Sequence, residues 1–294
     1  MMVRHTAPAF SPGMISLVRS WCWVKDSFAA DFDRLKDAGA FSPGDGSHTI
    51  WSTRSKFVLR VPVSPGFEAA YKGFYRVHGA QRYFCHPSPS STEAANYLRL
   101  EGLGFPLPEL LAVGEIRRGP FLRDAFFASR FIDGYRNGLD FIATDLPGTG
   151  QSAADLPLLK AFCSGHLALL ARLHDAGILH GGFTPSNLLY RQTPSGLVLR
   201  WVDVADCKDA RITVQEIADD AIHFFRYLSQ IDAGLRRKLL AGYLDAAKVP
   251  RTNLDELCSV LEQRLAKRMK PRAASVPMLS DSDTDSDATS ASAD

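Results

Sequence analysis

The chain has 294 residues, of which 46% are hydrophobic and 22% are charged, and its formal net charge is +2. This length and balance fit one bilobal domain or two closely packed ones. The 33 basic and 27 acidic residues before Pro271 leave an excess of six positive charges there. Such an excess suits a phosphate-bearing ligand or an anionic surface, and it is too weak to indicate nucleic-acid binding.

The five cysteines are widely separated, odd in number and without a C-x-x-C pair. This spacing argues against a disulfide framework and a zinc site, and it favours a reducing compartment. Prolines and a glycine interrupt the first 13 residues, so they do not resemble a signal peptide, and no run approaches 18 apolar residues. We therefore expect a cytoplasmic protein.

Residues 1–45 are expected to form an N-terminal extension. Its segment 15–24 is apolar and rich in aromatic residues, which predicts a packed strand or short helix. An alternative is a patch at a membrane interface, because Trp21 and Trp23 lie between Arg19 and Lys25. A short helix is expected at 31–38.

A pattern of period two follows and predicts the first lobe, residues 46–133. The expected strands are 49–53, 56–61, 68–75, 111–116 and 125–132. One helix, 93–102, lies between the third and fourth strands, with Thr92 as its expected N-cap. The sequence thus predicts a five-stranded antiparallel sheet with one inserted helix.

The second lobe, residues 134–270, is expected to be mostly helical. Apolar residues recur at helical spacing over 156–176, and further helices are predicted at 217–230, 235–247 and 254–270. Runs 188–190 and 197–202 flank a Pro-Ser-Gly turn and predict a hairpin. Residues 271–294 are acidic and of low complexity, and we expect them to be disordered.

A small sheet with one helix, followed by a helical half, is the element order of a protein kinase. Lys72 lies in the third strand, where kinases place the lysine that contacts nucleotide phosphates, and Glu93 opens the next helix, where its ion-pair partner belongs. Asn187 and Asp203 fall where the two metal-holding residues belong. The sequence therefore predicts an α+β, bilobal, protein-kinase-like fold.

The catalytic loop departs from the kinase pattern H-R-D-L-x-x-x-N. His180 and Asn187 keep the spacing, but Gly182 stands at the position of the catalytic aspartate. Asp206 is a candidate substitute for the missing carboxylate, and a solvent-exposed loop carboxylate is the alternative interpretation. His180 is expected to pack and to hydrogen-bond the backbone instead of reacting.

The turn that would cover the nucleotide departs as well, because residues 52–56 contain no glycine. Backbone amides would then cradle a phosphate less closely. Arg54 and Lys56 are candidates for supplying positive charge there, and ordinary turn residues are the alternative.

Three segments resemble the bacterial lipopolysaccharide core kinases that act on Kdo or heptose, of the WaaP/InaA type. They are Tyr-Lys-Gly-Phe-Tyr-Arg at 71–76, the run 92–115 with Phe-Pro-Leu-Pro-Glu-Leu-Leu-Ala-Val-Gly-Glu, and His180 with Pro-Ser-Asn-Leu-Leu at 185–189. The resemblance covers roughly residues 49–244. It implies ATP and Mg²⁺ as cofactors and a sugar hydroxyl of the lipopolysaccharide core as acceptor, at the cytoplasmic face of the inner membrane.

These observations allow two alternative functions of different class. The first is an ATP-dependent phosphotransferase that works without an aspartate at position 182, since general-base assistance is typically worth about 10²–10⁴-fold and its loss need not abolish transfer. The second is a pseudokinase that acts as a nucleotide-binding or scaffold protein. An aminoglycoside-type phosphotransferase shares the fold, but the 105–115 segment favours the lipopolysaccharide group.

Overall fold

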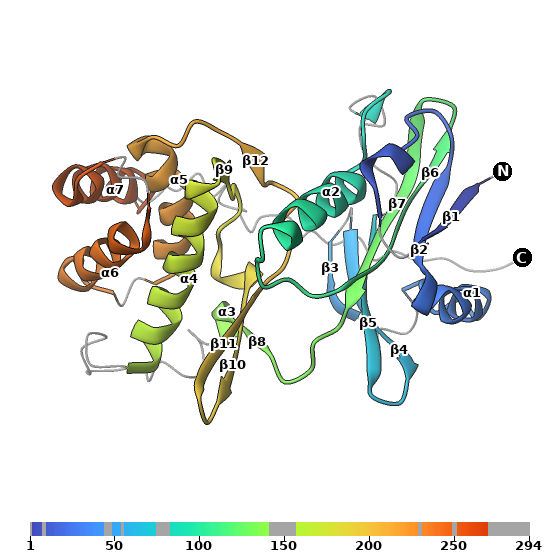
Figure 1. The fold of residues 1–294 in the computed structure, drawn as a ribbon, viewed down its shortest axis with the longest axis horizontal. Helices are drawn as coiled ribbons and strands as arrows, with labels where there is room; N and C mark the ends of the chain where they lie inside the picture. The colour runs from blue at the N-terminus through green and yellow to red at the C-terminus, as the bar shows by residue number, and fades with distance from the viewer. Residues whose placement is uncertain are drawn as a thin grey trace, which may run out of the picture.

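A computed structural model describes residues 2–7, 10–43, 49–53, 56–74, 83–140, 157–228, 231–248 and 252–269. One large sheet forms one half, and the long C-terminal helices together with a β-hairpin form the other, with helix α2 (Pro89–Gly102) between them (Figure 1). The predictions for Arg54 and for the acidic segment 271–294 lie outside the described residues.

The first half is built on one seven-stranded sheet in the order β1-β2-β6-β7-β5-β4-β3. All five predicted strands are present and pair antiparallel: β3 (Thr49–Ser52), β4 (Lys56–Ser64), β5 (Phe67–Phe74), β6 (Leu110–Arg118) and β7 (Phe121–Arg130). The expected number of five is nevertheless wrong. Residues of the N-terminal segment add β1 (Val3–Ala7) and β2 (Trp21–Lys25), which pair parallel to each other, with β2 antiparallel to β6.

Strand β2 shows why the N-terminal segment joins the sheet. Trp21 and Trp23 are 0% and 2% exposed and pack with Phe10 in the core that faces helix α2. The alternate residues Cys22 and Val24 pack on the other face, in the core that includes helix α1 (Ala29–Asp37). Both faces of the strand are covered, so the interpretation of the tryptophans as a membrane-interface patch is wrong.

Helix α2 begins earlier than predicted, because Ser88 and not Thr92 is its N-cap. The Ser88 side chain accepts a hydrogen bond from the Ser91 amide at 3.1 Å, and Pro89 takes the first helical position. The Ser88 amide donates to buried Glu115 of β6 at 2.7 Å, and Arg117 donates to the other Glu115 oxygen at 2.6 Å. A fully buried ion pair on β6 thus fixes the point where α2 starts.

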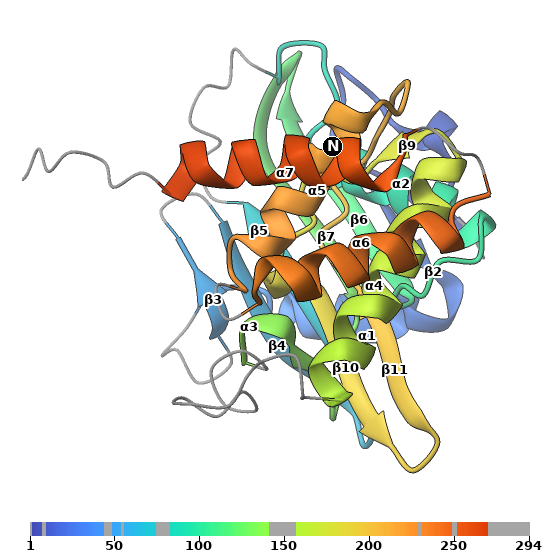
Figure 2. The same cartoon turned by 90° about the vertical axis from the view of Figure 1, so that its left-hand side faces the viewer.

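The second half is dominated by long helices that pack against one another, and they face the viewer in Figure 2. They are α4 (Pro157–Asp175), α5 (Val214–Phe225), α6 (Ala233–Ala246) and α7 (Leu254–Met269), close to the predicted ranges. The predicted hairpin is present as β10 (Leu188–Thr193) and β11 (Gly196–Trp201). The short elements β8 (Arg136–Asn137), α3 (Gly138–Asp140), β9 (Ile178–Leu179) and β12 (Lys208–Asp209) complete this half.

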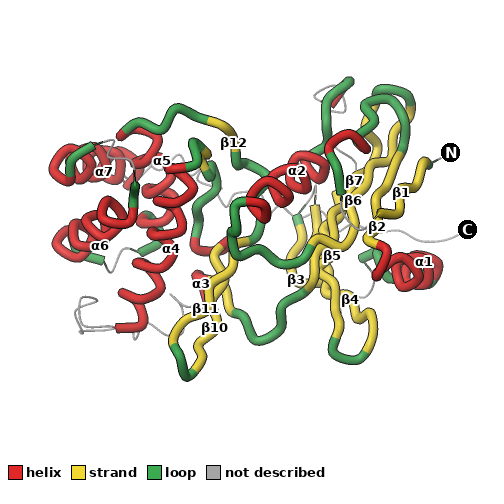
Figure 3. Tube along the Cα trace, in the orientation of Figure 1, coloured by secondary structure: helices red, strands yellow, loops and turns green. Residues whose placement is uncertain are grey.

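One hydrophobic core joins the two halves. It runs from Trp21 of the sheet through Leu100 of α2 and Trp201 of β11 to Phe224 of α5. The sheet, helix α2 and the helical half meet along this core, with α2 between the other two (Figure 3). No helix in the described ranges is long and apolar enough to cross a membrane.

Gly114 provides a test of the β2–β6–β7 packing. A Cβ on Gly114 would lie 2.5 Å from the Phe126 ring and 2.9 Å from the Cys22 Cβ, and the latter atom has no freedom to move aside. We expect Gly114→Ala to lower the free energy of unfolding by about 1–3 kcal/mol, measured by urea denaturation. Gly242→Ala in α6 is the control, because open space surrounds that position and the change is expected to stabilise by up to ~1 kcal/mol. Equal effects of the two changes would contradict the packing described.

Candidate active site

Lys72 of β5 joins three parts of the fold. Its Nζ lies 2.9 Å from Oε2 of Glu93 on α2 and 2.6 Å from Oδ1 of Asp203, in the loop after β11. Lys72 is 9% exposed and Glu93 is 2% exposed. The Asp203 side chain is 36% exposed, so it is the partner that a ligand can reach.

Elementary strand and helix geometry produces this arrangement. Lys72 pairs with Val58 of β4 and Phe127 of β7, so it lies inside the sheet with strands on both sides. Helix α2 packs on β6 and β7, which brings Glu93 over the sheet. An ammonium group is tolerated in this buried place because two carboxylates accept its hydrogen bonds.

The electrostatics keep the lysine charged. Burial by itself would lower the pKa of Lys72, but the Glu93 and Asp203 carboxylates outweigh it and raise that pKa. Burial raises the pKa of Glu93 against the opposing effect of Lys72. Burial would also raise the pKa of Asp203, but Lys72 more than offsets this, and the Asp203 pKa is lowered.

Lys56 lies at the edge of this group and does not bind the carboxylates directly. Its Nζ sits 5.1 Å from the centre of the Trp51 ring. Its positive charge nonetheless lowers the pKa of both Glu93 and Asp203. The sequence-based candidate Lys56 therefore adds positive potential to the site, while the other turn candidate, Arg54, falls outside the described residues.

Asp203 has a strained backbone. Its φ angle is +56°, and among the non-glycine residues that the structure describes only Cys85 shares a positive φ. Such a conformation costs about 1–3 kcal/mol and persists only where its surroundings enforce it. Here the Lys72 ion pair holds the side chain, and the preceding Val202 amide donates to the Asn187 carbonyl at 3.0 Å. Strain of this kind is typical of functional sites.

Asn187 is oriented by its own loop. It ends the short helical turn η6 (Pro185–Asn187), and its Nδ2 donates to the Gly182 carbonyl at 3.0 Å. An amide oxygen and a carboxylate, from Asn187 and Asp203, are ligands that Mg²⁺ prefers. The described residues contain no group of three or more histidine, cysteine, aspartate or glutamate side chains that would hold a metal alone.

Asp206 lies beside the empty side-chain position of Gly182. A Cβ built on Gly182 would be 3.6 Å from Asp206 Oδ2, 3.7 Å from Asn187 Nδ2 and 4.0 Å from His180 Nδ1. The neighbouring Gly181 has φ +73°, and a Cβ there would meet the Asp206 carbonyl at 2.8 Å. The Asp206 carboxylate thus lies within van der Waals distance of the position that a Cβ on residue 182 would have.

Asp220 of α5 is a site residue that sequence reasoning missed. It is 1% exposed and accepts hydrogen bonds from the backbone amides of His180 and Gly181, both at 2.8 Å. Its Oδ2 also lies 3.0 Å from His174 Nε2, and His174 Nδ1 lies 2.7 Å from the Tyr243 hydroxyl. Burial would raise the pKa of Asp220, but these hydrogen bonds and the nearby histidines lower it. The only available signal was an aspartate on the apolar face of a predicted helix.

His180 is a buried packing residue. Its ring contacts Trp201 and Phe183 edge to face, and Nδ1 accepts a hydrogen bond from the Gly182 amide at 3.3 Å. Burial lowers the pKa of this imidazole, which favours its neutral form. It therefore shapes the loop that carries Gly182 and Asn187.

Asn96 of α2 is the second residue that was missed. Its Nδ2 lies 2.9 Å from the Val204 carbonyl, 3.2 Å from the Ala205 carbonyl and 2.9 Å from the Cys207 carbonyl. One amide thus secures the loop between Asp203 and Asp206 to the helix that carries Glu93. Asn96 follows Glu93 by almost one helical turn, which was the only hint in the sequence.

Comparison with solved structures shows the fold. The chain is similar to WaaP in complex with acyl carrier protein, with a TM-score of 0.55 at 15% identity over 81% of this chain and 93% of that one. It is also similar to the Rio2 kinase–ADP/Mg²⁺–phosphoaspartate complex from Chaetomium thermophilum, with a TM-score of 0.45 at 16% identity, covering 82% of this chain and 74% of that one. No family model and no curated protein sequence matches. The expected likeness to a lipopolysaccharide kinase is confirmed at the level of the protein-kinase-like fold.

Removing the lysine tests the buried ion pair. Lys72→Met leaves Glu93 buried without its partner, and we expect a loss of about 3–5 kcal/mol in the free energy of unfolding by urea denaturation. The double change Lys72→Met with Glu93→Gln should recover part of that loss, because no unpaired charge remains. Asp203→Asn is expected to cost less than Lys72→Met, since Asp203 is the more exposed partner. An Asp203 change that costs as much as the lysine change would contradict this assignment.

The lowered pKa of Asp220 predicts that the stability of the protein depends on pH. Because the pKa of Asp220 is lowered in the folded state, its stabilisation is present above the ordinary aspartate value of about 3.9 and is lost as the pH falls through the folded pKa. Asp220→Asn should lower the free energy of unfolding at pH 7 by about 1.5–3 kcal/mol. The difference between the two proteins should shrink below about pH 4 in urea denaturation series. A difference that stays constant down to pH 3 would show that the ionised carboxylate is not what stabilises the loop.

Proposed function

We propose that the chain is an ATP- and Mg²⁺-dependent phosphotransferase that phosphorylates a sugar hydroxyl of the lipopolysaccharide core. The observation that carries this proposal is the buried Lys72, bound at once to Glu93 and Asp203. A merely structural ion pair needs one carboxylate. The second, half-exposed carboxylate on a strained backbone is the arrangement expected of a group that exchanges its lysine contact for a cation.

In this proposal the residues mainly position the reactants. Bound ATP would supply the phosphoryl group, and Mg²⁺ would neutralise charge on it. Lys72, held by Glu93, would donate hydrogen bonds to phosphate oxygens, and Asp203 and Asn187 would hold the cation through their side-chain oxygens. Lys56 would add positive potential at the edge of the sheet, as its effect on the two carboxylates indicates. Arg54, which lies outside the described residues, would supply further positive charge at the same turn.

Asp206 would orient the acceptor hydroxyl and take its proton. Its Oδ2 lies 3.6 Å from the position that a Cβ on residue 182 would have, and its side chain is exposed to an incoming acceptor. General-base assistance is typically worth about 10²–10⁴-fold in rate. The loop would thereby retain a carboxylate at the acceptor side although position 182 is glycine.

The acceptor class rests on sequence resemblance. The 105–115 segment resembles the lipopolysaccharide core kinases, and the fold agrees with the WaaP structure, whose 15% identity supports the fold alone. The acceptor would be Kdo or heptose of the core, reached at the cytoplasmic face of the inner membrane. The modest positive excess of the chain is compatible with such an anionic acceptor.

A pseudokinase is the second candidate, and Gly182 is the observation that favours it. A nucleotide-binding scaffold would keep the Lys72–Glu93 pair and would have no use for Asp206. Nucleotide binding is common to both candidates, whereas transfer that depends on Asp206 belongs to the first alone.

Two measurements test the proposal in sequence. Thermal unfolding with ATP should show a stabilising shift that requires Mg²⁺ and is lost in Asp203→Asn. No shift at saturating ATP would exclude both nucleotide-binding candidates. Transfer of labelled phosphate from ATP to dephosphorylated lipopolysaccharide core should then be measured with wild type and Asp206→Asn.

Asp206→Asn should lower kcat by about 10²–10⁴-fold while leaving the Mg²⁺-ATP shift intact. Asp209→Asn is the matched control, because Asp209 is a neighbouring exposed carboxylate whose partner is Arg99, away from Gly182. Wild-type protein that binds ATP but transfers no phosphate would support the scaffold candidate.

A further inference from the structure

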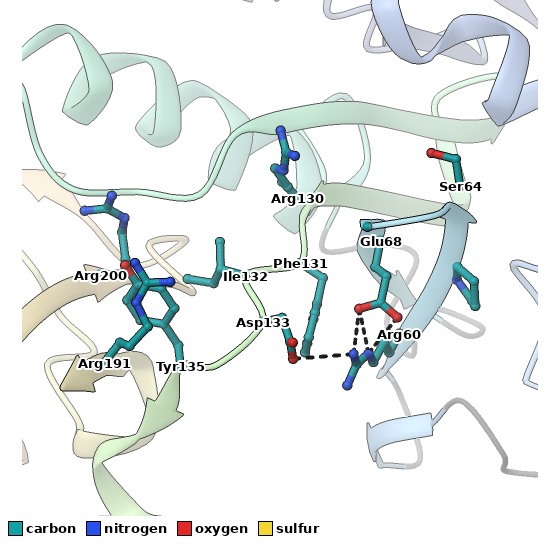
Figure 4. Close-up of a pocket in the computed structure, with 12 residues that line it drawn as sticks. Arg60, Ser64, Glu68, Arg130, Phe131, Ile132, Asp133, Tyr135, Arg191 and Arg200 are labelled. Atoms are coloured by element: carbon teal, nitrogen blue, oxygen red, sulfur yellow. Dashed lines mark hydrogen bonds and ion pairs between the residues drawn. The ribbon is translucent and has the colours of Figure 1, made fainter. Parts of the chain in front are cut away.

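A cavity of about 570 Å³ lies between the two halves, away from Lys72 and its partners. It lies where the β4–β5 hairpin, the segment after β7 and the β10–β11 hairpin meet (Figure 4). Its lining includes Glu68, which precedes Lys72 by four residues on β5, or ~13 Å along a strand. None of the proposed nucleotide, metal or base residues lines it. A cavity of this size suits a small molecule and exceeds the needs of a single ion.

The cavity has two ends of different character. At one end Arg60 binds Glu68 through several hydrogen bonds of 2.6–2.9 Å, and it reaches Asp133 at 3.5 Å. At the other end, Arg191 and Arg200 lie together beside Tyr135 (Figure 4). The carboxylates of the lining thus lie at the Arg60 end. At the other end, no carboxylate of the described residues pairs with Arg191 or Arg200.

Strand register places the two arginines together. Residue 191 of β10 pairs with Val198, and residue 200 of β11 pairs with Leu189, so Arg191 and Arg200 stand on the same face of the hairpin. The Arg191 guanidinium lies 4.9 Å from the centre of the Tyr135 ring, and Arg200 donates to the Leu199 carbonyl at 3.2 Å. Within the described part of the chain, neither is paired with a carboxylate, so most of their N–H donors are available to a ligand.

We propose that this cavity binds a small sugar phosphate, with Arg191 and Arg200 as the ligands of the phosphate group. Two guanidinium groups on one face match the oxygens of a phosphate and bind it by charge-assisted hydrogen bonds. The Glu68 and Asp133 carboxylates at the opposite end retain lone pairs that accept hydrogen bonds from sugar hydroxyls. The distribution of charge therefore selects a molecule with an anionic end and a hydroxyl-rich end.

Such a ligand would connect the two halves of the protein. Arg60, Glu68 and Arg130 belong to the sheet, whereas Arg191 and Arg200 belong to the β10–β11 hairpin of the helical half. A molecule held at both ends restrains the connection between β7 and β8, which forms the wall of the cavity. The site shares no residue with those proposed for phosphotransfer.

Isothermal titration calorimetry of the full chain with glucose 1-phosphate tests this inference, with glucose and inorganic phosphate as partial ligands. Saturable binding of glucose 1-phosphate is expected to be tighter than that of either partial ligand. In the double variant Arg191→Ala with Arg200→Ala, the affinity should fall by about tenfold or more. Arg191→Lys with Arg200→Lys should give an intermediate affinity, because charge remains and the fork geometry is lost.

Arg226→Ala is the matched control, since Arg226 also stacks on a tyrosine, 4.6 Å from the Tyr227 ring centre, and does not line the cavity. Its affinity for glucose 1-phosphate should equal that of wild type. Absence of saturable binding, equal affinity in the double alanine variant, or glucose binding as tight as that of glucose 1-phosphate would each overturn the inference. The Mg²⁺-ATP thermal shift of the double variant should match wild type, so failure here is distinguishable from failure of the proposed function.

Discussion

The arrangement of the candidate site depends on one buried ammonium group shared by two carboxylates. Lys72 comes from the sheet, Glu93 from α2 and Asp203 from the loop after β11, so a single cation connects the three parts that a nucleotide would have to contact. Two carboxylates around one ammonium leave a negative surplus at the more exposed carboxylate. A divalent cation bound there would relieve that surplus, and the lysine would then be free to contact phosphate.

Two buried polar residues keep the surrounding loops in place. Asp220 accepts the amide hydrogens of His180 and Gly181, which fixes the loop before Asn187. Asn96 faces three carbonyl oxygens of the loop between Asp203 and Asp206, which fixes the other side. Because both loops are held by side chains on helices, Asp220 of α5 and Asn96 of α2, the contact between Asp206 and the Gly182 position is set by rigid elements.

Much of the fold could be predicted because its patterns are local. Alternating strands, the stripe of α4 and the hairpin turn each depend on neighbours in sequence, and these predictions agree with the structure. Strand β2 overlaps segment 15–24, for which a packed strand was one of the two predictions. Its place in the main sheet was missed because it is buried on both faces and therefore lacks a period-two pattern. Strand β1 was not predicted. The N-cap was misplaced because Thr92 and Ser88 carry similar side chains. Pro89 after Ser88 was a local signal for the earlier start, and the contact of Ser88 with Glu115 is long-range.

The candidate site was partly predictable for the same reason. Motif spacing located Lys72, Glu93, Asn187 and Asp203, since each follows a recognisable element. The position of Asp206 relative to Gly182 depends on two loops 24 residues apart, and the contacts of Asp220 and Asn96 cross between helices and loops. Nothing local in the sequence encodes such distances. The sequence offered Asp206 as a candidate, but its position beside Gly182 and the contacts of Asp220 and Asn96 emerged only from the three-dimensional arrangement.

The central claim is that Asp206 supplies the carboxylate that position 182 lacks. Its most direct test is an exchange of the two positions, Gly182→Asp with Asp206→Asn, assayed by the rate of phosphate transfer from ATP to dephosphorylated lipopolysaccharide core. The account predicts that the exchanged protein recovers a large part of the activity lost in Asp206→Asn alone, because one carboxylate again occupies the same region. An exchanged protein as inactive as the Asp206→Asn protein, or an Asp206→Asn protein as active as wild type, would contradict it.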